Sequence, residues 1–354
     1  MEFNDCTAPS YQVLRPLLPA TKTFPVFADL VDQLLVTHEH PDPVIAYVLA
    51  VCSAYAYSDA GTVAMIMARL GLEENKCRMV AEYVDVLFLT STSFLLQSKD
   101  GRVVILCYRG TPPTSLITWL TDLEIDPVKL KIPAPPRTGE YDPPGDYYVH
   151  GGFYRNVRST RYLLESALKR AIDGLSVHED GKAMDHGMEA LYITGHSLGG
   201  ASAAMLAAML KTEPAFAPIA DRLRAVYTYG APMIGSPEFA DACNENDFLR
   251  EKLLRYVYAN DIVPQLPPKE SGPFAHFGTE YRYKPPRDHS TWYQSEPRKQ
   301  LRNLVELATT PLSILAKQLT ATRDFPFHAS INDHLPQYYI DALRPRDVRS
   351  EFGD

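Results

Sequence analysis

The feature that most constrains the fold is a glycine motif between an apolar run and a helix-forming run. Gly195-His196-Ser197-Leu198-Gly199 follows the apolar residues 191–194 and precedes residues 201–206, which favour a helix. A strand, a sharp turn and a helix are the context that the G-x-S-x-G pattern requires. Because glycine has no side chain, the two glycines avoid clashes in the sharp turn. The Ser197 hydroxyl then stands clear of the sheet, at the positive N-terminal end of the helix that follows. The motif predicts a nucleophilic serine on an α/β sheet.

The rest of the sequence fits such a sheet. Beyond residue 145, strand and helix patterns alternate, which indicates a mainly parallel sheet covered by helices on both faces. An N-terminal helical part is expected over residues 1–78, with helices at 43–57 and 62–70, followed by a hairpin of 94–97 and 103–108. Later strands are expected at 147–150, 191–194, 225–229 and 255–258, and helices at 155–171, 198–210 and 237–247. We predict one α/β domain over residues 1–354.

Net charge and composition limit the kinds of partner that the protein is expected to bind. The net charge of −8 argues against a nucleic-acid partner, so binding to a lipid surface would rely on apolar contact or a local basic patch. The five cysteines show no metal or redox spacing and are interpreted as free thiols. The first 24 residues lack a basic segment followed by an apolar run, so we expect no secretory signal and a cytoplasmic protein or export by a non-Sec route. Nothing in the sequence indicates the oligomeric state.

A serine nucleophile needs a histidine base and an acid that orients it, and in α/β-hydrolases the acid precedes the histidine along the chain. Asp261 follows the expected strand 255–258, so it lies at a strand end where active-site groups collect. Asp241 and Asp247 lie in or at the end of a helix and are expected to be solvated. The histidines that follow the acid are His276, His289, His328 and His334.

Several further motifs occur in an order that resembles the class 3 lipases, the fungal-lipase-like branch of the α/β-hydrolases. The similarity extends from about residue 42 to residue 339. The matching segments are Arg109-Gly110-Thr111 after an apolar strand, Trp119-Leu120-Thr121-Asp122-Leu123, His150-Gly151-Gly152-Phe153, residues 195–200, Thr228-Tyr229-Gly230-Ala231-Pro232 and Asp261-Ile262-Val263-Pro264-Gln265-Leu266-Pro267-Pro268. The resemblance implies an α/β-hydrolase fold with a lid or cap segment.

The resemblance also implies roles for individual residues. Asp333-His334 with Tyr338 resembles the setting of the family's histidine, so His334 becomes the expected base, with Asp261 as the acid. His328 is its main rival, whereas His276 and His289 are interpreted as surface residues. The amides of Leu198 and Thr111 are the expected oxyanion hole. His196 is expected to pack beneath the turn, and His150 and Arg109 to serve as scaffold.

Two segments could cover the site. Apolar residues at helix-like spacing follow Thr111 in a lid and Pro-rich loop over residues 112–145; they are Leu116, Ile117, Trp119, Leu120 and Leu123. A helical insertion, broken near Pro311, is expected over residues 298–323, and its Leu312 and Leu315 would form part of the acyl-site wall. The alternative for both segments is an ordinary packing helix.

These inferences predict a serine hydrolase that cleaves acyl esters of lipids, in the manner of a triacylglycerol lipase. Phospholipase A or galactolipase activity, a short-chain soluble esterase and, as a different class, an inactive binding module remain alternatives. The expected partner is a lipid or ester substrate, with transient contact at a lipid interface. We expect no organic cofactor and no metal: His38-Glu39-His40-Pro41-Asp42 resembles a metallo-β-lactamase-type motif, but Pro43 follows and Asp42 is better used as a helix cap.

Overall fold

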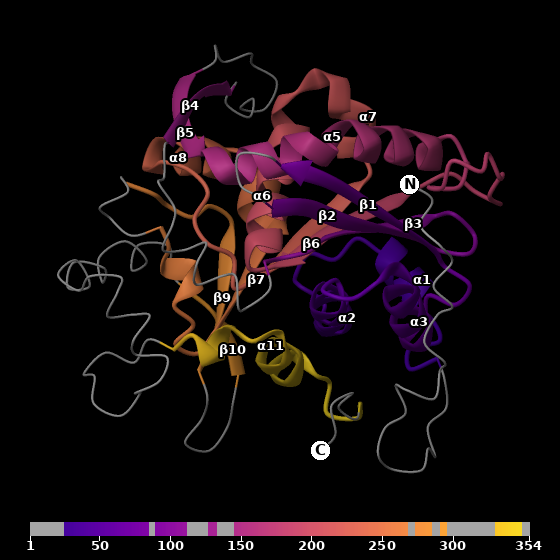
Figure 1. Cartoon of the computed structure of the whole chain (residues 1–354). Helices are drawn as coiled ribbons and strands as arrows, with labels where there is room; N and C mark the ends of the chain where they lie inside the picture. Colours follow the sequence, from indigo (N-terminus) through magenta and orange to yellow (C-terminus); the bar gives the residue numbers. More distant parts are fainter. Residues whose placement is uncertain are drawn as a thin grey trace.

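The chain is built around an eight-stranded sheet with the strand order β1-β2-β3-β6-β7-β8-β9-β10 (Figure 1). The computed structural model describes residues 25–84, 89–111, 127–132, 145–267, 273–284, 291–295 and 330–348. The strands are β1 (Lys76–Val84), β2 (Leu89–Gln97), β3 (Val103–Tyr108), β6 (Ala190–His196), β7 (Leu223–Tyr229), β8 (Leu253–Tyr258), β9 (Thr279–Lys284) and β10 (Thr291–Gln294). Pairing is parallel from β3 to β9 and antiparallel at both edges. The expected parallel core of an α/β fold is therefore confirmed.

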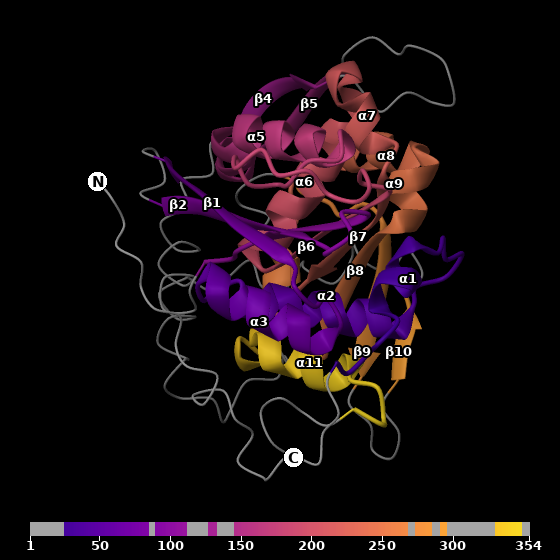
Figure 2. The ribbon, with the colours of Figure 1, turned by 90° about the vertical axis from the view of Figure 1, so that its right-hand side faces the viewer.

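Helices cover both faces of the sheet, as Figures 1 and 2 show. One face carries α5 (Gly151–Ile172), α6 (Leu198–Thr212), α7 (Ala217–Ala220), α8 (Pro237–Glu245) and α9 (Asp247–Lys252). The other face carries α1 (Leu30–Leu35), α2 (Pro43–Tyr55), α3 (Ala60–Leu70) and α11 (Pro336–Leu343). Short 3-10 turns form η3 (Pro214–Phe216), η4 (Val263–Gln265) and η8 (Asn332–His334). None of the described helices is long and apolar enough to cross a lipid bilayer.

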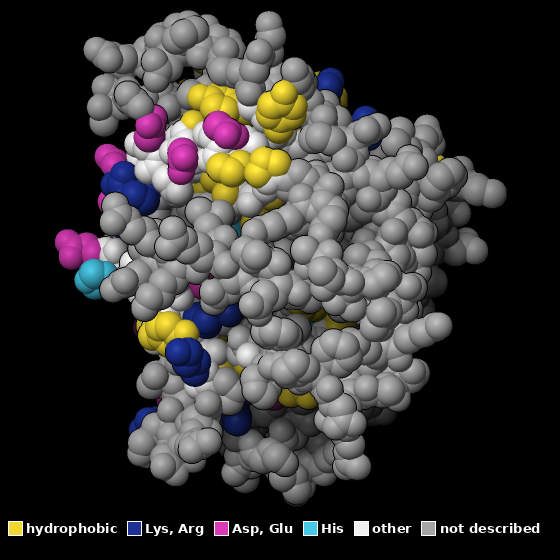
Figure 3. Space-filling view, turned by 90° about the vertical axis from the view of Figure 1, so that its left-hand side faces the viewer, with side chains coloured by type: hydrophobic (Ala, Val, Ile, Leu, Met, Phe, Trp, Pro, Cys, Tyr) yellow, Lys and Arg dark blue, Asp and Glu magenta, His cyan; other side chains and the backbone are white. Residues whose placement is uncertain are grey.

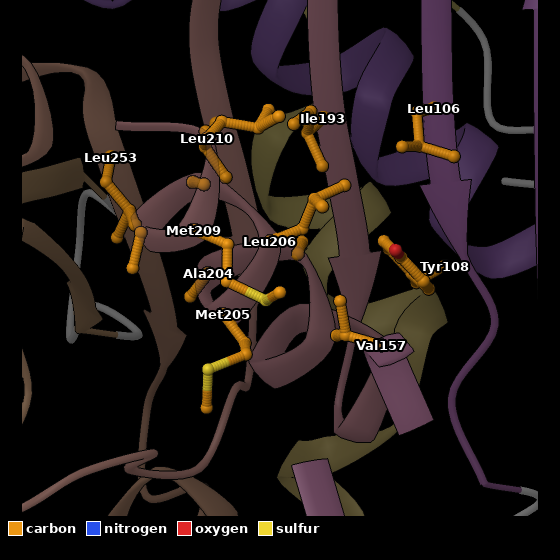
Figure 4. Packing of buried hydrophobic residues seen from close by; sticks show 14 of the residues in the cluster. Leu106, Tyr108, Val157, Ile193, Ala204, Met205, Leu206, Met209, Leu210 and Leu253 are labelled. Carbon is orange, nitrogen blue, oxygen red and sulfur yellow. The ribbon is translucent and has the colours of Figure 1, made fainter. Parts of the chain in front are cut away.

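The sheet separates two apolar cores because successive side chains of a strand point to opposite faces. On β3, Val104, Leu106 and Tyr108 pack with α5 and α6. The alternate residues Val103, Ile105 and Cys107 pack with α2 and α3. Figure 4 shows the first core, in which Leu206 of α6 packs among Ile193, Leu106 and Tyr108 of the sheet. Burial on both faces explains why the central strands are apolar throughout.

The sequence anticipated several local features. Asp42 caps α2, since its Oδ1 accepts hydrogen bonds from the amides of Val44 at 2.8 Å and Ile45 at 3.0 Å. The hairpin of β2 and β3 forms as expected, and Asp100 in its turn accepts a hydrogen bond from the Ser98 hydroxyl at 2.6 Å. The described cysteines Cys52, Cys77, Cys107 and Cys243 are free thiols.

The strand expected at 147–150 does not join the main sheet. It is part of β5 (Gly145–His150), which pairs with β4 (Pro127–Ile132) in a separate antiparallel ribbon and forms an isolated bridge from Val149 to Gly235. The pattern of apolar residues predicts a strand but not its partner, and the implied place in the parallel sheet was wrong. The edge strands β9 and β10 were not predicted, because polar and aromatic residues dominate them.

Charge is distributed unevenly over the surface. On the face in Figure 3, acidic side chains gather in the upper part, at the level of α8. This helix exposes Glu238, Asp241 and Glu245. The exposure of Asp241, and of Asp247 at the start of α9, agrees with the expectation that neither is the buried acid.

Candidate active site

Four parallel strands end at the same edge of the sheet and bring the candidate residues together. Ser197 follows β6, Thr111 lies beyond β3, Gly230 follows β7 and Asp261 lies beyond β8. The carboxyl ends of the strands in an open α/β sheet form the edge where ligands bind. Residues that are far apart in the sequence therefore face one site.

Ser197 has a backbone conformation that few non-glycine residues adopt. Its φ is 59° and its ψ is −129°, and its amide donates a hydrogen bond to the carbonyl of Tyr229 at 2.9 Å. The flanking glycines are required, because a Cβ on Gly195 would lie 2.3 Å from the Gly199 carbonyl carbon, and one on Gly199 would lie 2.2 Å from the Tyr108 oxygen. A conformation this strained persists only where the surroundings fix it, which is typical of functional positions. Since α6 begins at Leu198, the turn also lies at a helix N-terminus.

Asp261 and His334 form a buried pair. The Asp261 Oδ2 atom lies 2.8 Å from His334 Nδ1, and neither side chain is more than 5% exposed. The carboxylate also accepts the amide of Val263 at 2.9 Å and the hydroxyl of Tyr339 at 2.5 Å. Burial and the neighbouring Asp261 carboxylate raise the pKa of Tyr339, so its phenol stays a donor. The three contacts fix the carboxylate and leave His334 oriented by its Nδ1 atom.

The segment of His334 is joined to the turn after β8 by two hydrogen bonds. The Ser330 amide donates to the Asn260 carbonyl at 2.8 Å, and the Asn260 amide donates to Asp333 Oδ2 at 3.0 Å. Gly230 closes the other side with a φ of +59°; a Cβ there would lie 2.7 Å from Asp261 Oδ2 and 2.9 Å from His334 Nδ1. The acid and the histidine are therefore held from both sides.

Three polar atoms at this edge are buried without a hydrogen-bond partner among the described residues: Ser197 Oγ, His334 Nε2 and Thr111 Oγ1. Most buried polar groups are hydrogen-bonded, so unpaired ones call for an explanation such as a ligand or a catalytic role. With Nδ1 directed at Asp261, a neutral His334 presents its Nε2 lone pair and can accept a proton. The arrangement contains a hydroxyl, a proton acceptor and an orienting carboxylate, which are the groups of nucleophilic catalysis.

The other histidines differ from His334. His150 is buried and its Nδ1 accepts the amide of Gly152 at 3.1 Å at the start of α5; burial lowers its pKa to about 4, as suits a neutral scaffold residue. His276 is not the surface residue that the sequence suggested: it is half-buried and its Nε2 lies 2.7 Å from the Pro264 carbonyl. Its immediate neighbours Phe274, Ala275 and Phe277 are apolar and buried, and they were the sequence signal that could have indicated this burial. His289 and His328 lie outside the described residues.

The sequence patterns gave no indication of Tyr339, and they assigned no role to Gly230 beyond its place in a matching motif. Tyr338 is 39% exposed and stacks on Tyr258, whereas the adjacent Tyr339 contacts Asp261. The helical phase of α11 directs Tyr339, and not Tyr338, toward Asp261. The expected lid residues Leu116, Ile117, Trp119, Leu120 and Leu123, and Leu312 and Leu315 of the expected insertion, lie outside the described residues.

Comparison with known proteins supports the same interpretation. Residues 105–271 match the family model for lipase (class 3). A triacylglycerol lipase, OBL1 of Ricinus communis, is 27% identical over 252 residues, which cover 64% of this chain and 47% of that protein. The chain therefore spans about half the length of this curated relative.

Solved structures share the fold. Lipase II from Rhizopus niveus superposes with a TM-score of 0.54 at 23% identity, covering 83% of this chain and 92% of that one. A triacylglycerol lipase described as having a serine protease triad as its catalytic centre superposes with a TM-score of 0.51 at 20% identity, covering 82% and 91%. Over residues 105–271, just under half of the chain, the protein is therefore similar to the lipase (class 3) family.

Proposed function

We propose that this protein is a serine carboxylic-ester hydrolase that acts on acyl esters of lipids. The observation with the greatest weight is that two reactive atoms, Ser197 Oγ and His334 Nε2, are both buried and unpaired among the described residues, while Asp261 orients the histidine. A purely structural serine in a strained turn would be expected to satisfy its hydroxyl. The family assignment supports the same chemistry.

The proposed reaction needs only protein groups. Ser197 Oγ attacks the ester carbonyl carbon as His334 Nε2 takes its proton, and the amides of Leu198 and Thr111 stabilise the resulting oxyanion. The tetrahedral intermediate then collapses: the ester C–O bond breaks, the alcohol leaves with the proton from His334, and an acyl group remains on Ser197. Water, deprotonated by His334, attacks the acyl-enzyme and releases the carboxylic acid, which regenerates Ser197.

The substrate class follows from the relatives and the sequence. The similar protein of Ricinus communis is named a triacylglycerol lipase, which supports an acyl ester of a lipid. The apolar residues of segment 112–123 are consistent with a cover over an apolar acyl chain. Contact with a lipid interface would then be transient and would depend on apolar residues, since the net charge of −8 opposes an anionic surface.

Covalent labelling tests the activity directly. A fluorophosphonate probe and p-nitrophenyl esters should react with the wild-type protein. Ser197→Ala should abolish labelling and lower kcat by about 10⁶-fold, because the nucleophile is lost. Ser159→Ala, at a half-buried serine on α5, is the matched control and should leave both unchanged. Labelling of the Ser197→Ala variant at the wild-type rate would show that another residue is the nucleophile. A wild-type protein inert to probe and esters would leave only a binding module.

A panel of esters tests the substrate class. We expect kcat/KM to rise with acyl chain length and activity on emulsified triacylglycerol. Headgroup comparison with phospholipid and galactolipid esters identifies which lipid is preferred. A sharp preference for acetyl esters, with no turnover of emulsions, would make the protein a soluble esterase instead.

A further inference from the structure

His196, the residue before Ser197, is fully engaged by hydrogen bonds that the proposed reaction does not use. The side chain is 3% exposed. Its Nε2 lies 2.7 Å from the main-chain oxygen of His334, and its Nδ1 lies 2.9 Å from the hydroxyl of Tyr57, beyond the end of α2. As expected from the sequence, His196 packs beneath the turn, but it does so against the very residue proposed as the base.

The two partners determine the tautomer of His196. A carbonyl oxygen only accepts hydrogen bonds, so His196 Nε2 carries the hydrogen and donates it to His334. Burial lowers the pKa of His196 well below its ordinary value, and the neighbouring His334 acts in the same direction, so the ring is neutral. Its Nδ1 atom is then an acceptor, and Tyr57 must be the donor. Burial raises the pKa of Tyr57, which keeps this phenol protonated.

Ring packing adds to these bonds. The rings of His196 and His334 have centroids 4.4 Å apart with planes at 35°, and the ring of Tyr339 lies 5.8 Å from that of His196. His334 is therefore held at its Nδ1 by Asp261, and at its main-chain oxygen and ring by His196. The second support comes from the peptide neighbour of Ser197.

The Arg109-Gly110-Thr111 turn, which holds the proposed oxyanion donor Thr111, packs closely against Tyr57 and His196. A Cβ on Gly110 would lie 2.2 Å from the Tyr57 hydroxyl and 2.6 Å from the carbonyl oxygen of His196. A glycine is thus needed for the Arg109-Gly110-Thr111 turn to approach the Tyr57–His196 pair. The pair lies where the nucleophile turn, the oxyanion turn and the segment of His334 meet.

From these contacts we infer that His196 is a positioning residue that sets the place of His334 relative to Ser197, with Tyr57 fixing its tautomer. The inference rests on the proposed hydrolase function and adds a role outside the three reacting groups. Because His196 and Ser197 share a peptide bond, a hydrogen bond from His196 to the base ties nucleophile and base to one short piece of backbone. Small misplacements of reacting groups can cost about 100-fold in rate, so such a tie has catalytic consequences.

Three variants test the role. His196→Phe keeps an aromatic ring but removes both hydrogen bonds, and should lower kcat on p-nitrophenyl esters about 10- to 100-fold with KM unchanged. His196→Gln restores a donor for the His334 carbonyl and an acceptor for Tyr57, and should recover most of kcat. Tyr57→Phe removes only the outer bond and should have a smaller effect than His196→Phe. If His196→Phe does not fold, the Gln and Tyr57 variants still provide the comparison.

A matched control separates positioning from stability. His276→Phe also removes a 2.7 Å contact between a histidine Nε2 and a main-chain carbonyl, but that carbonyl belongs to Pro264 and not to the base. We expect it to lower the melting temperature about as much as His196→Phe while reducing kcat far less. Equal losses of kcat in the two variants, no loss in His196→Phe, or no recovery in His196→Gln would overturn the inference. Absence of Ser197-dependent hydrolysis in the wild type would refute the proposed function instead.

Discussion

The turn of the proposed nucleophile Ser197 is assembled mainly from residues that are neighbours in the sequence, whereas the proposed acid–base pair, Asp261 and His334, joins residues 73 positions apart. In the turn, strain in Ser197 is held by glycines of the same five-residue motif and by α6, which starts at once. In the pair, Asp261 and His334 lie on separate segments that are held by Tyr339, Asn260 and the close approach of Gly230.

This difference shows how the two regions are encoded. The sharp turn at Ser197 depends mainly on the glycines of its own motif, although the Ser197 amide also donates to the distant Tyr229 carbonyl. A long-range pair depends on the whole sheet, since β7, β8 and α11 must all be in place before the two side chains meet. We therefore expect the loss of kcat caused by a substitution in the pair to depend on the contacts around the pair. The loss caused by a substitution in the turn should depend mainly on the turn itself.

Removal of the charge on the acid should have the largest effect within the pair. Asp261→Asn should lower kcat by about 10⁴-fold, because an asparagine favours the wrong tautomer of the base while keeping its shape. Steady-state hydrolysis of p-nitrophenyl esters measures the change, with Asp241→Asn on the exposed face of α8 as control. Turnover near that of the wild type would show that another group orients His334.

Crowding the pair should have a smaller but clear effect. Gly230→Ala places a Cβ 2.7 Å from Asp261 Oδ2 and 2.9 Å from His334 Nδ1 at a residue with φ of +59°. The pair must shift to relieve the contact, so we expect about a 100-fold loss of kcat. Fluorophosphonate labelling should slow in parallel. Gly181→Ala, also at positive φ but with no atom within 4 Å, controls for backbone strain. Comparable losses in the two variants would assign the effect to strain alone.

The same contrast explains what the sequence could predict. The G-x-S-x-G motif is local, and Ser197 lies in the predicted strand–turn–helix context. Asp261 was inferred from its place after a strand, which is a property of one segment. His334 needed the family resemblance, because four histidines follow the acid and only the folded chain brings one of them within 2.8 Å of Asp261.

Errors arose where the answer depended on distant partners. The strand at 147–150 formed, but its partner is β4 and not the main sheet. His276 was interpreted as a surface residue, yet it is half-buried and its Nε2 lies 2.7 Å from the Pro264 carbonyl of η4. Tyr339 was missed because its role depends on the phase of α11 relative to β8. Pattern and composition fix elements, whereas pairing, burial and side-chain contacts depend on the assembled fold.

Removing the Tyr339 hydroxyl that bonds to Asp261 should lower kcat less than either substitution above. Tyr339→Phe keeps the ring that packs near His196 and removes the hydroxyl, which donates to Asp261 at 2.5 Å and accepts the Tyr258 amide at 3.1 Å. The carboxylate retains the Val263 amide and His334, so we expect a loss of about 10-fold in kcat, the size of one hydrogen bond to a charged group. Tyr338→Phe is the matched control one residue away and should be silent. A large effect in Tyr338→Phe with none in Tyr339→Phe would contradict the role of the Tyr339 hydroxyl.

The smallest expected effect is on the free energy of unfolding, and it concerns His276, which lies near the Asp261–His334 pair. Burial lowers the pKa of His276 to about 3, whereas an unfolded histidine titrates near ~6.5. Between these values the unfolded chain binds more protons at this site. The stability contributed by neutral His276 is therefore complete above about pH 6.5 and is lost as the pH falls toward 3. His276→Gln keeps a donor for the Pro264 carbonyl but does not titrate.

Denaturant unfolding at pH 7 and pH 5 measures this contribution. The free energy of unfolding of the wild type should fall between these pH values by up to about 2 kcal/mol more than that of His276→Gln. His186→Gln, at an exposed histidine, should follow the wild type at both pH values. Because His276 bonds to the turn that follows Asp261, a confirmed difference would place a source of acid sensitivity beside the long-range pair. Parallel pH dependence in wild type and His276→Gln would show that His276 is solvated enough to titrate normally in the folded protein.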